Sequence, residues 1–393
     1  MPWKSSNVVD LRVQFIAAVA AEAHEPFSGI CKRFGISRRT GYKWLARYNE
    51  GGPAALDDAS SKPKSSPRST APALVSQIRA LRLEHPYWGP KKLHARLVSL
   101  FPEQSWPAPS TIAGLLSRLG LILPKKKRVR WPIVSAPIAT TDAPNDTWCV
   151  DFKGQFRLGD RSHCYPLTIT DLHSRFIIAI QCFARIDSDE TLAEFERVFR
   201  LFGLPRRIRS DNGVPFSTLA VGRLSKLSVR WQQLGIEIER IEPGHPEQNG
   251  AHERMHRSMK AEAMQQIAKS LEEQQLVFDR FRAQFNDHRP HEALAMKTPS
   301  ALYTCSSRAL PAVIEEAEYP AADRVLKVFQ PGVIELQGKR VRLHRMLIGE
   351  RVGVVSVGDN EWRVEWRGVT LGIVNAEAAE PQIRPAKTAG TSR

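Results

Sequence analysis

The chain lacks the long apolar run that a membrane-spanning helix needs. No stretch of the 393 residues approaches 18 consecutive apolar positions, and charged residues occur throughout the first 30. We therefore expect neither a membrane helix nor a signal peptide. Cysteine is sparse too: the five cysteines lie far apart, and none belongs to a C-x-x-C pair. This pattern indicates reduced thiols in a cytosol-like compartment, with no zinc finger.

Acidic residues are scarce in the first third of the chain. Residues 1–139 contain 22 Lys and Arg against 8 Asp and Glu, a balance of +14. The remaining 254 residues contain 35 against 33, a balance of only +2. A positive surplus confined to one end is typical of a polyanion-binding arm. We therefore expect a nucleic-acid-binding front end and a nearly neutral body.

The first 56 residues predict a helix-turn-helix DNA-binding domain (1–56). A short helix over about 26–34 meets Gly35, and Ser37 is a suitable N-cap for the second helix. The second helix of such a pair enters the major groove. The alternative is an ordinary helical hairpin with a solvated basic face. The expected buried side consists of Ile36, Tyr42, Trp44 and Leu45, and the DNA-contact candidates are Arg38, Arg39, Thr40 and Lys43.

A Ser/Pro-rich linker over 57–72 leads to a second predicted helix-turn-helix domain over 73–123. We expect Ser110 to cap its last helix, and Ser110 and Thr111 are DNA-contact candidates. A basic linker over 124–145 follows, either as a solvated charge run or as an arm that tracks phosphates. Its DNA-contact candidates are Lys125, Lys126, Lys127, Arg128 and Arg130.

The body of the chain changes from helices to strands. The runs DTWCVDFKGQF, HCYPLTITDL and SRFIIAIQCF are separated by polar turns and predict a meander. An amphipathic helix follows, with Ser188 or Asp189 as its cap and Gly203 as its end. RRIRSDNG and IEIERIE predict further strands, and we expect a helix from Pro246 through about Ile267. This order predicts an α/β sheet with ligand chemistry at strand ends.

Three acids of the body are candidates for metal binding. Asp151 lies in WCVDFKG, Asp211 in RIRSDNGVPF and Glu247 in PGHPEQNGAHERMHR. Between Asp211 and Glu247 there are 35 residues, and between Asp151 and Asp211 there are 59. The spacing alone is not specific, because 41 of the 393 residues are acidic. Three converging carboxylates can hold two Mg²⁺ ions, which stabilise the attacking and leaving oxygens when a phosphodiester is broken.

Five motifs stand together in this body: TWCVDF, TITDLHSRFI, RSDNGVPF, GIEIERIEPGHPEQNGAHERMHR and, at 285–303, FNDHRPHEALAMKTPSALY. With them the body resembles the catalytic core of bacterial insertion-sequence transposases, a branch of the retroviral-integrase-like (DDE) superfamily. The basic front end also resembles the DNA-binding region of that family. The resemblance implies a ribonuclease H-like integrase core over 146–305, with a mixed sheet flanked by helices.

The resemblance also implies a chemistry. Position by position, Asp151, Asp211 and Glu247 match the three catalytic, metal-binding carboxylates of the family. The implied reaction is metal-dependent hydrolysis that frees 3′-hydroxyls at the ends of a mobile element, followed by their attack on target DNA. No Ser, Tyr or Cys lies in a recognisable nucleophile motif, as expected when no covalent protein intermediate forms. The expected cofactor is Mg²⁺, as two ions, with Mn²⁺ as a substitute.

The implied partners are double-stranded DNA, as terminal repeats and as target, and further copies of this chain. A homodimer or larger assembly is expected because two element ends must be cut and joined together. Asn249 and Arg254 are candidates for contacts with DNA phosphates, whereas Asp171 is expected to make a structural hydrogen bond. We expect a bacterial, cytoplasmic, nucleoid-associated protein with no membrane partner.

One segment has a competing interpretation. The run HERMH, with His252 and His256, matches the H-E-x-x-H motif of zinc metalloproteases. On a continuous helix both histidines would lie almost opposite Glu247, so only one of the two metal sites is expected. The third zinc ligand would have to be Glu272 or Glu273, and the zinc hypothesis leaves the basic front end unexplained. A DNA-binding regulator with an inactive core is the other alternative.

The expected fold is multidomain, and its last domain is all-β. Residues 306–375 include short alternating runs such as GVIEL, RVGVVSV and EWRVEW, broken at glycine-containing turns. About five strands in about 50 residues predict a small SH3-like barrel. Residues 376–393 are expected to form a disordered tail.

Overall fold

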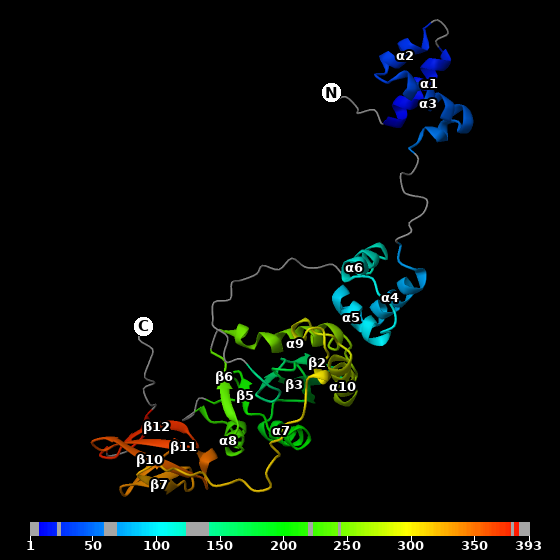
Figure 1. The fold of residues 1–393 in the computed structure, drawn as a ribbon. Coiled ribbons are helices and arrows are strands. Elements are labelled where there is room, and N and C mark those ends of the chain that lie inside the picture. Colours follow the sequence, from blue (N-terminus) through cyan, green and yellow to red (C-terminus); the bar gives the residue numbers. More distant parts are fainter. Residues whose placement is uncertain are drawn as a thin grey trace. The chain divides into compact units, whose positions relative to one another are not determined.

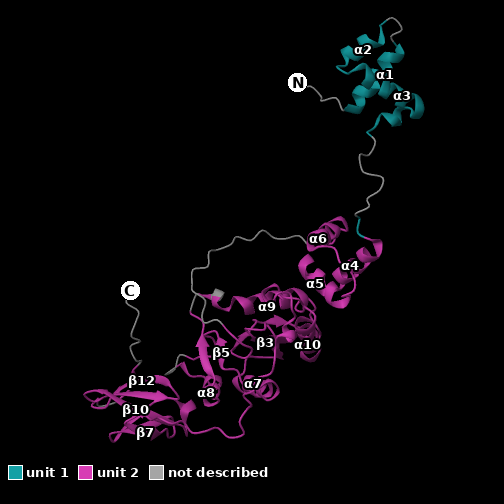
Figure 2. Ribbon diagram, in the orientation of Figure 1, with its two compact units in different colours: residues 1–70 teal, residues 71–393 magenta. Residues whose placement is uncertain are grey.

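The computed structural model describes residues 8–21, 25–58, 69–122, 141–218, 223–242, 245–378 and 381–384, without the side chains of Pro246 and Glu247. The chain divides into two compact units, residues 1–70 and residues 71–393 (Figures 1 and 2). No described helix is long and apolar enough to cross a membrane. All five cysteines are free thiols, as predicted.

The first unit contains the predicted helix-turn-helix. Its elements are α1 (Val8–Ala21), α2 (Phe27–Arg33), α3 (Arg38–Gly51) and the 3₁₀ turn η1 (Pro53–Leu56). Gly35 supplies the turn with a φ of +67°, which is why a glycine stands there. Ser37 caps α3 as predicted, because its Oγ accepts a hydrogen bond from the backbone N–H of Thr40 at 3.2 Å.

The buried side of α3 differs from the prediction at one residue. Tyr42 was expected inside, but it is 59% exposed. Gly41 and Trp44 face the core instead, and Cys31 and Phe15 approach Gly41 so closely that a Cβ there would clash with them. Tyr42 follows Gly41 by about 100° around the helix and therefore stacks on Phe27 at the surface, with ring centroids 4.3 Å apart.

The second helical module contains three helices, α4 (Pro72–Glu84), α5 (Pro90–Leu100) and α6 (Pro109–Arg118). They enclose a small core that includes Ile78, Trp88 and Leu93. The predicted cap of α6 is wrong: the helix begins at Pro109, so Ser110 lies inside its first turn. Proline at the first helical position has the helical φ already and lacks an N–H that would need a cap.

A six-stranded mixed sheet forms the centre of the α/β core. Its order is β2-β3-β1-β5-β6, with β4 paired to β3. β1 is antiparallel to β3 and parallel to β5, so it has neighbours on both sides. The predicted meander and the two later strands are present, and the two-residue β2 was not predicted. The strands are β1 (Thr147–Phe152), β2 (Phe156–Arg157), β3 (His163–Asp171), β4 (Ile177–Phe183), β5 (Arg207–Ser210) and β6 (Glu237–Arg240).

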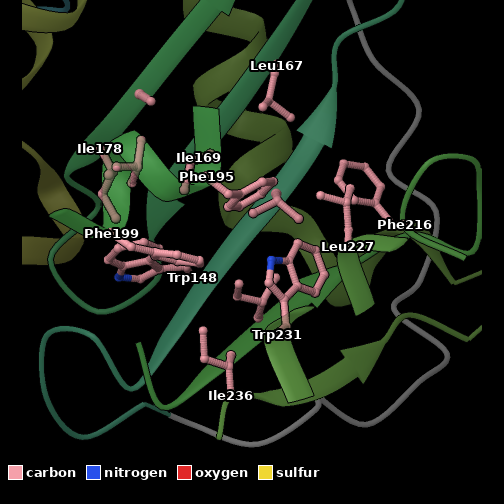
Figure 3. Close-up of a cluster of buried hydrophobic side chains, with 14 of the residues drawn as sticks. Trp148, Leu167, Ile169, Ile178, Phe195, Phe199, Phe216, Leu227, Trp231 and Ile236 are labelled. Atoms are coloured by element: carbon pink, nitrogen blue, oxygen red, sulfur yellow. The ribbon is translucent and has the colours of Figure 1, made fainter. Parts of the chain in front are cut away.

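Helices cover both faces of this sheet. The aromatic residues of α7 and α8 pack with Trp148 and Val150 on one face (Figure 3). On the other face α9 and α10 pack against Ile177 and Ile180. Because side chains alternate along a strand, Cys149 and Asp151 of β1 point toward the α9 face. The helices are α7 (Ser188–Phe202), α8 (Lys226–Gln233), α9 (Gly250–Glu262) and α10 (Leu271–Asp287), with the 3₁₀ turns η3 (Pro246–Asn249), η4 (Glu292–Leu294) and η5 (Pro299–Ala301).

The N-cap of α7 lies one residue before Ser188, the first of the two predicted caps. Asp187 is the N-cap, and its carboxylate accepts from the backbone N–H groups of Asp189 and Glu190. A carboxylate at this position also interacts favourably with the positive end of the helix dipole. The predicted end at Gly203 is confirmed, with a φ of +76°.

The C-terminal region is all-β, but the predicted closed barrel is not confirmed. Its strands form an open five-stranded sheet, β13-β12-β11-β10-β7, and a separate hairpin, β8-β9. Among the described residues, the hairpin pairs with its flanking segments through two isolated bridges, Phe329 to Val333 and Arg342 to Gln382. Isolated bridges do not make the continuous hydrogen-bonded ladder that closes a barrel. The strands are β7 (Arg324–Lys327), β8 (Val333–Leu336), β9 (Lys339–Arg342), β10 (Arg351–Gly358), β11 (Glu361–Trp366), β12 (Val369–Asn375) and β13 (Ile383–Arg384), and η6 (Arg345–Leu347) precedes β10.

The predicted tail over 376–393 needs a correction as well. Within it Ile383 and Arg384 form β13, which pairs with Ile373 and Val374 of β12. Two residues are too short for a strand signal in the sequence, and the neighbouring strand supplies the pairing. Residues 385–393 lie outside the described part of the chain.

Candidate active site in the α/β core

Asp151 lies on β1, an inner strand paired with β3 on one side and β5 on the other. Thr168 of β3 lies directly opposite it in the register of the two strands, and its hydroxyl lies 3.0 Å from the carbonyl oxygen of Asp151. The Asp151 side chain is 23% exposed and therefore keeps an opening to solvent. A carboxylate fixed on a central strand, with one side open, is a suitable platform for a ligand.

Asp211 comes directly after β5 and lies level with Asp151 along the direction of the strands. β1 and β5 run parallel, with Cys149 opposite Arg209, and each acid follows its partner of that pair by two residues. The backbone N–H of Gly213 donates to Asp211 Oδ1 at 3.1 Å, and a Cβ at Gly213 would lie 3.0 Å from Oδ2. Asn212 fixes the other side of the turn by donating to the carbonyl of Ile241 at 2.7 Å. The Asn-Gly turn thus positions Asp211.

The helix that follows begins later than expected. The predicted helix from Pro246 to Ile267 is wrong, because α9 spans Gly250–Glu262 and the 3₁₀ turn η3 precedes it. Arg209 donates to the backbone carbonyl of Gln248 at 3.0 Å, and the Gln248 side chain accepts from the N–H of Glu242 at 2.9 Å. These bonds tie the segment to the strand ends and favour a tight turn. Glu247 therefore does not lie on the same α-helix as His252 and His256. The expectation that it lies opposite them around one helix axis no longer applies.

The acids that converge with Asp151 include one that the sequence interpretation missed. Among the described side chains, Asp211 and Glu253 are the carboxylates whose charges act on Asp151, and Glu253 lies in the first turn of α9. The side chain of Glu247 lies outside the described residues. The sequence contained a pattern that could have pointed to Glu253. The buried face of α9 repeats at helical spacing, and Glu253 lies at the edge of that face. The residues of the face are His252, Met255, His256 and Met259.

The electrostatics of this group are unbalanced. Burial, and then the charges of Asp211 and Glu253, raise the pKa of Asp151 from 3.8 to about 7, while Lys153 acts in the opposite direction. Like charges that crowd a partly buried carboxyl disfavour its ionised form. A divalent cation at this place would neutralise the repulsion, so the donor set fits a hard metal ion.

The raised pKa of Asp151 predicts a pH dependence of stability in the metal-free protein. Because the folded state binds this proton more tightly than the unfolded state, stability falls as pH rises from about 4 to about 7. At about 1.4 kcal/mol per pKa unit, the effect amounts to a few kcal/mol. Thermal unfolding in a chelator should show this fall in wild type, and Asp151→Asn should lack that part of it. Parallel pH profiles for the two proteins would contradict the assignment.

The two histidines of the H-E-x-x-H match are buried against β3. Thr168 Oγ1 lies 2.8 Å from Nε2 of His252 and 2.8 Å from Nε2 of His256. Thr170 Oγ1 lies 2.7 Å from Nδ1 of His252, so both nitrogens of that ring have partners. Burial lowers the pKa of His252 to about 3 and also lowers the pKa of His256. A protease zinc site needs two histidines whose ring nitrogens are free to bind the metal. Here the rings are neutral and are hydrogen-bonded to threonines instead.

The third ligand that the zinc hypothesis named, Glu272 or Glu273, does not join the two histidines among the described residues. The one ligand cluster found among the described residues contains Asp151, His252 and His256. Glu272 and Glu273 of α10 lie outside it, and Glu273 accepts a hydrogen bond from the backbone of Lys269. The metalloprotease alternative is therefore not favoured.

Two further polar predictions have different outcomes. Asp171 is structural, as expected: it is fully buried and accepts from the backbone N–H groups of Asn145 and Ser174. Asn249 was a candidate for phosphate contact, but it is 6% exposed at the start of α9. As the last residue of η3 it exposes little surface, and its contact with a DNA phosphate stays a prediction.

The other DNA-contact candidates lie mostly at the surface. Arg38, Arg39 and Lys43 are exposed at the N-terminal half of α3, and Thr40 is half-buried because its hydroxyl meets Ser37. Ser110 and Thr111 are exposed in the first turn of α6. The candidates of the basic linker, Lys125, Lys126, Lys127, Arg128 and Arg130, lie outside the described residues.

A basic cavity lies beside α9, and the sequence did not single it out. Its volume is about 540 Å³, and four arginines of the core line it. One guanidinium nitrogen of Arg175 is buried without a hydrogen-bond partner among the described residues. Cations that are partly removed from water and left unpaired favour the binding of an anion. The four arginines are Arg175, Arg254, Arg257 and Arg289.

Sequence families match the core and the front end separately. Two integrase core domain families match residues 141–246 and residues 234–299. A helix-turn-helix domain family matches residues 11–64, and a homeodomain-like domain family matches residues 40–116. The matches thus cover both helical modules and the α/β core.

Relatives occur in bacterial insertion elements. The chain is 26% identical over 245 residues to the uncharacterized 39.2 kDa protein of insertion element IS476 from Xanthomonas euvesicatoria, covering 62% of this chain and 67% of that protein. It is 25% identical over 230 residues to the uncharacterized 31.7 kDa protein of insertion element IS407 from Burkholderia multivorans, covering 58% and 79%.

Among solved structures, the HTLV-2 integrase catalytic core domain in complex with magnesium is similar at a TM-score of 0.33 and 17% identity, covering 41% of this chain and 98% of that one. That likeness is weak, and the sequence matches are the stronger relation. The integrase-core matches, the helix-turn-helix matches and the insertion-element relatives agree with one another. The chain therefore contains an integrase core domain and helix-turn-helix domains, and it is similar to proteins of bacterial insertion elements.

Proposed function

We propose that this protein binds the ends of a mobile element, hydrolyses phosphodiesters there and joins the freed 3′-hydroxyls to target DNA. The observation that carries the proposal is the convergence of Asp211 and Glu253 on Asp151, in a core that follows two helix-turn-helix modules. Asp151, Asp211 and Glu253 are the proposed catalytic carboxylates. Glu253 replaces Glu247 in this set.

The proposed cofactor is a pair of Mg²⁺ ions, for which Mn²⁺ can substitute. The fit rests on the three crowded acids and on the raised pKa of Asp151, which a cation would relieve. When bound, the ions stabilise the attacking and leaving oxygens of the phosphodiester. Asp151 offers its carboxylate from a fixed strand, Asp211 from the Asn-Gly turn and Glu253 from the first turn of α9.

DNA contacts are proposed on three surfaces of the chain. The exposed side of α3 and the first turn of α6 are suited to major-groove and phosphate contacts. The basic linker adds a salt-dependent contribution to affinity. Beside α9, the arginine-lined cavity is suited to a backbone phosphate, with Arg254 and Arg257 exposed at its rim. A homodimer or larger assembly would bring two element ends together.

The proposed domain boundaries follow the sequence prediction, with the changes noted above. They are helix-turn-helix domains over 1–56 and 73–123, a core over 146–305 and an all-β region from 306. A function as a DNA-binding regulator without catalysis is not favoured, because the carboxylates that act on one another lie at one place in the core.

A nicking assay tests the proposed function. Supercoiled plasmid that carries the element's ends should be nicked by the full chain in Mg²⁺ or Mn²⁺, and a chelator should prevent it. Asp151→Asn should bind the same DNA and leave it intact. Nicking that survives the chelator, or equal nicking by wild type and Asp151→Asn, would refute the proposal. Peptide hydrolysis stopped by a zinc chelator would instead restore the protease hypothesis.

A further inference from the structure

The buried hydrogen bonds between α9 and β3 fix the protons on two histidines. Thr168 Oγ1 has three neighbours: the carbonyl oxygen of Asp151 at 3.0 Å and the Nε2 atoms of His252 and His256, each at 2.8 Å. A hydroxyl donates one hydrogen and accepts two. The carbonyl oxygen can only accept, so Thr168 donates to Asp151. Both imidazoles must then donate their Nε2 hydrogens to Thr168.

This assignment leaves one nitrogen with an unused lone pair. His252 and His256 are 1% and 0% exposed, and a neutral imidazole carries a single N–H. His252 Nδ1 therefore accepts from the hydroxyl of Thr170, 2.7 Å away. His256 Nδ1 is buried without a hydrogen-bond partner. All four hydrogen bonds are satisfied, and the lone pair of His256 Nδ1 remains.

The remaining lone pair faces a candidate metal-binding carboxylate. His256 Nδ1 lies 3.7 Å from Asp151 Oδ2. Two acceptors that face one another in a partly buried place repel each other unless a proton or a metal cation lies between them. With metal–ligand distances of about 2.0–2.2 Å, two donors on one tetrahedral ion lie about 3.3–3.6 Å apart. The observed separation is close to that of two ligands of a single ion.

We propose that His256 Nδ1 is a direct ligand of the metal ion at Asp151, which gives this site a nitrogen donor and a preference for Mn²⁺ or Zn²⁺ over Mg²⁺. The proposal rests on the proposed function only for the presence of a metal at the three acids. Imidazole suits zinc and other transition metals better than Mg²⁺, which selects oxygen. Glu253 and His256 are three residues apart and share a face of α9, so one helix would present both.

His252 has a different role in this arrangement. Both of its nitrogens are bonded to threonines of β3, and its ring meets that of His256 edge-on at a centroid distance of 4.4 Å. It therefore positions Thr168 and the ring of His256. The H-E-x-x-H match thus contains one proposed metal ligand, His256, and one positioning residue, His252.

The test measures metal binding in the full chain without DNA. Electron spin echo spectroscopy of bound Mn²⁺ detects a directly coordinated ¹⁴N, and wild type should show that coupling. His256→Gln places an amide near the former Nε2, keeps a partner for Thr168 and removes Nδ1. It should lose the nitrogen coupling and weaken Mn²⁺ about tenfold or more, with a change for Mg²⁺ of about threefold or less. His252→Gln is the matched control and should keep the coupling.

Two results would overturn the proposal. One is Mn²⁺ bound by wild type without nitrogen coupling, which would mean an all-oxygen site with Asp151 only hydrogen-bonded to His256. The other is an equal loss of Mn²⁺ and Mg²⁺ affinity in a folded His256→Gln protein. If that variant does not fold, the wild-type spectrum alone decides. If the protein shows nitrogen coupling but never nicks DNA, the proposed function is refuted, whereas His256 is still a metal ligand.

Discussion

Asp211→Asn is expected to abolish both DNA cleavage and strand joining, by about 10³-fold or more, while DNA binding persists. An amide oxygen is a poor ligand for Mg²⁺ and carries no charge to hold it. Asp211 is exposed, and among the described residues its carboxylate accepts one hydrogen bond, from Gly213 N–H. The Asn side chain can accept that bond, so the fold should be unchanged. Single-turnover cleavage of end DNA and a binding titration would measure the two effects.

The matching control for Asp211 is the buried Asp171. Asp171 is fully enclosed and accepts from the backbone N–H groups of Asn145 and Ser174. Its replacement by Asn should lower thermal stability, because an amide cannot accept all of these bonds. Full activity in Asp211→Asn, with the loss found only in Asp171→Asn, would remove Asp211 from the metal site.

Glu253→Gln and Glu247→Gln are expected to differ by about 10³-fold in cleavage rate, because one of the two acids is proposed to bind metal. Glu253 acts electrostatically on Asp151 from the first turn of α9. Glu247 precedes that helix, in the 3₁₀ turn η3. We expect Glu253→Gln to lose cleavage and joining and Glu247→Gln to remain within about threefold of wild type.

The same pair of variants also has a second readout. Removing Glu253 removes one of the two carboxylates that raise the pKa of Asp151, so the metal-free protein should lose less stability between pH 4 and 7. Glu247→Gln should leave that profile as in wild type. The reverse pattern, with Glu247→Gln inactive and Glu253→Gln active, would restore the assignment made from the sequence.

The sequence predicted the elements with strong periodicity and the acids that follow strands. The runs DTWCVDFKGQF and RRIRSDNG predicted β1 and β5, which bring Asp151 and Asp211 to one level of the sheet. Parallel neighbours bring their ends together whatever the details of the loops. The resemblance to the transposase core singled out these two acids, and the strand runs before them place both at strand ends.

The third acid required a helix boundary, and boundaries depend on tertiary contacts. The start of α9 is set by Arg209 and Glu242, which bond Gln248 from the ends of two strands. No local pattern around Pro246 reports those contacts. The role of the histidines was hidden for the same reason, since Thr168 and Thr170 meet them only after β3 and α9 are packed together.

The C-terminal region shows a different limit. Its strands were predicted from alternation and glycine turns, but closure depends on pairing between runs far apart in the chain. The hairpin β8-β9 is joined to its flanking segments by isolated bridges, which no alternation pattern predicts. The sequence therefore predicts how many strands the C-terminal region has more readily than whether those strands close into a barrel.

The most direct test of the central claim is a map of the 3′ ends and joined products on DNA that carries the ends of the element. With Mg²⁺, the full chain should leave 3′-hydroxyls at the element tips and then link those ends to a target plasmid. A chelator should stop both steps, and Glu253→Gln should show neither. Ends with a 3′-phosphate, ends linked to protein, or cutting that continues without metal would contradict the account.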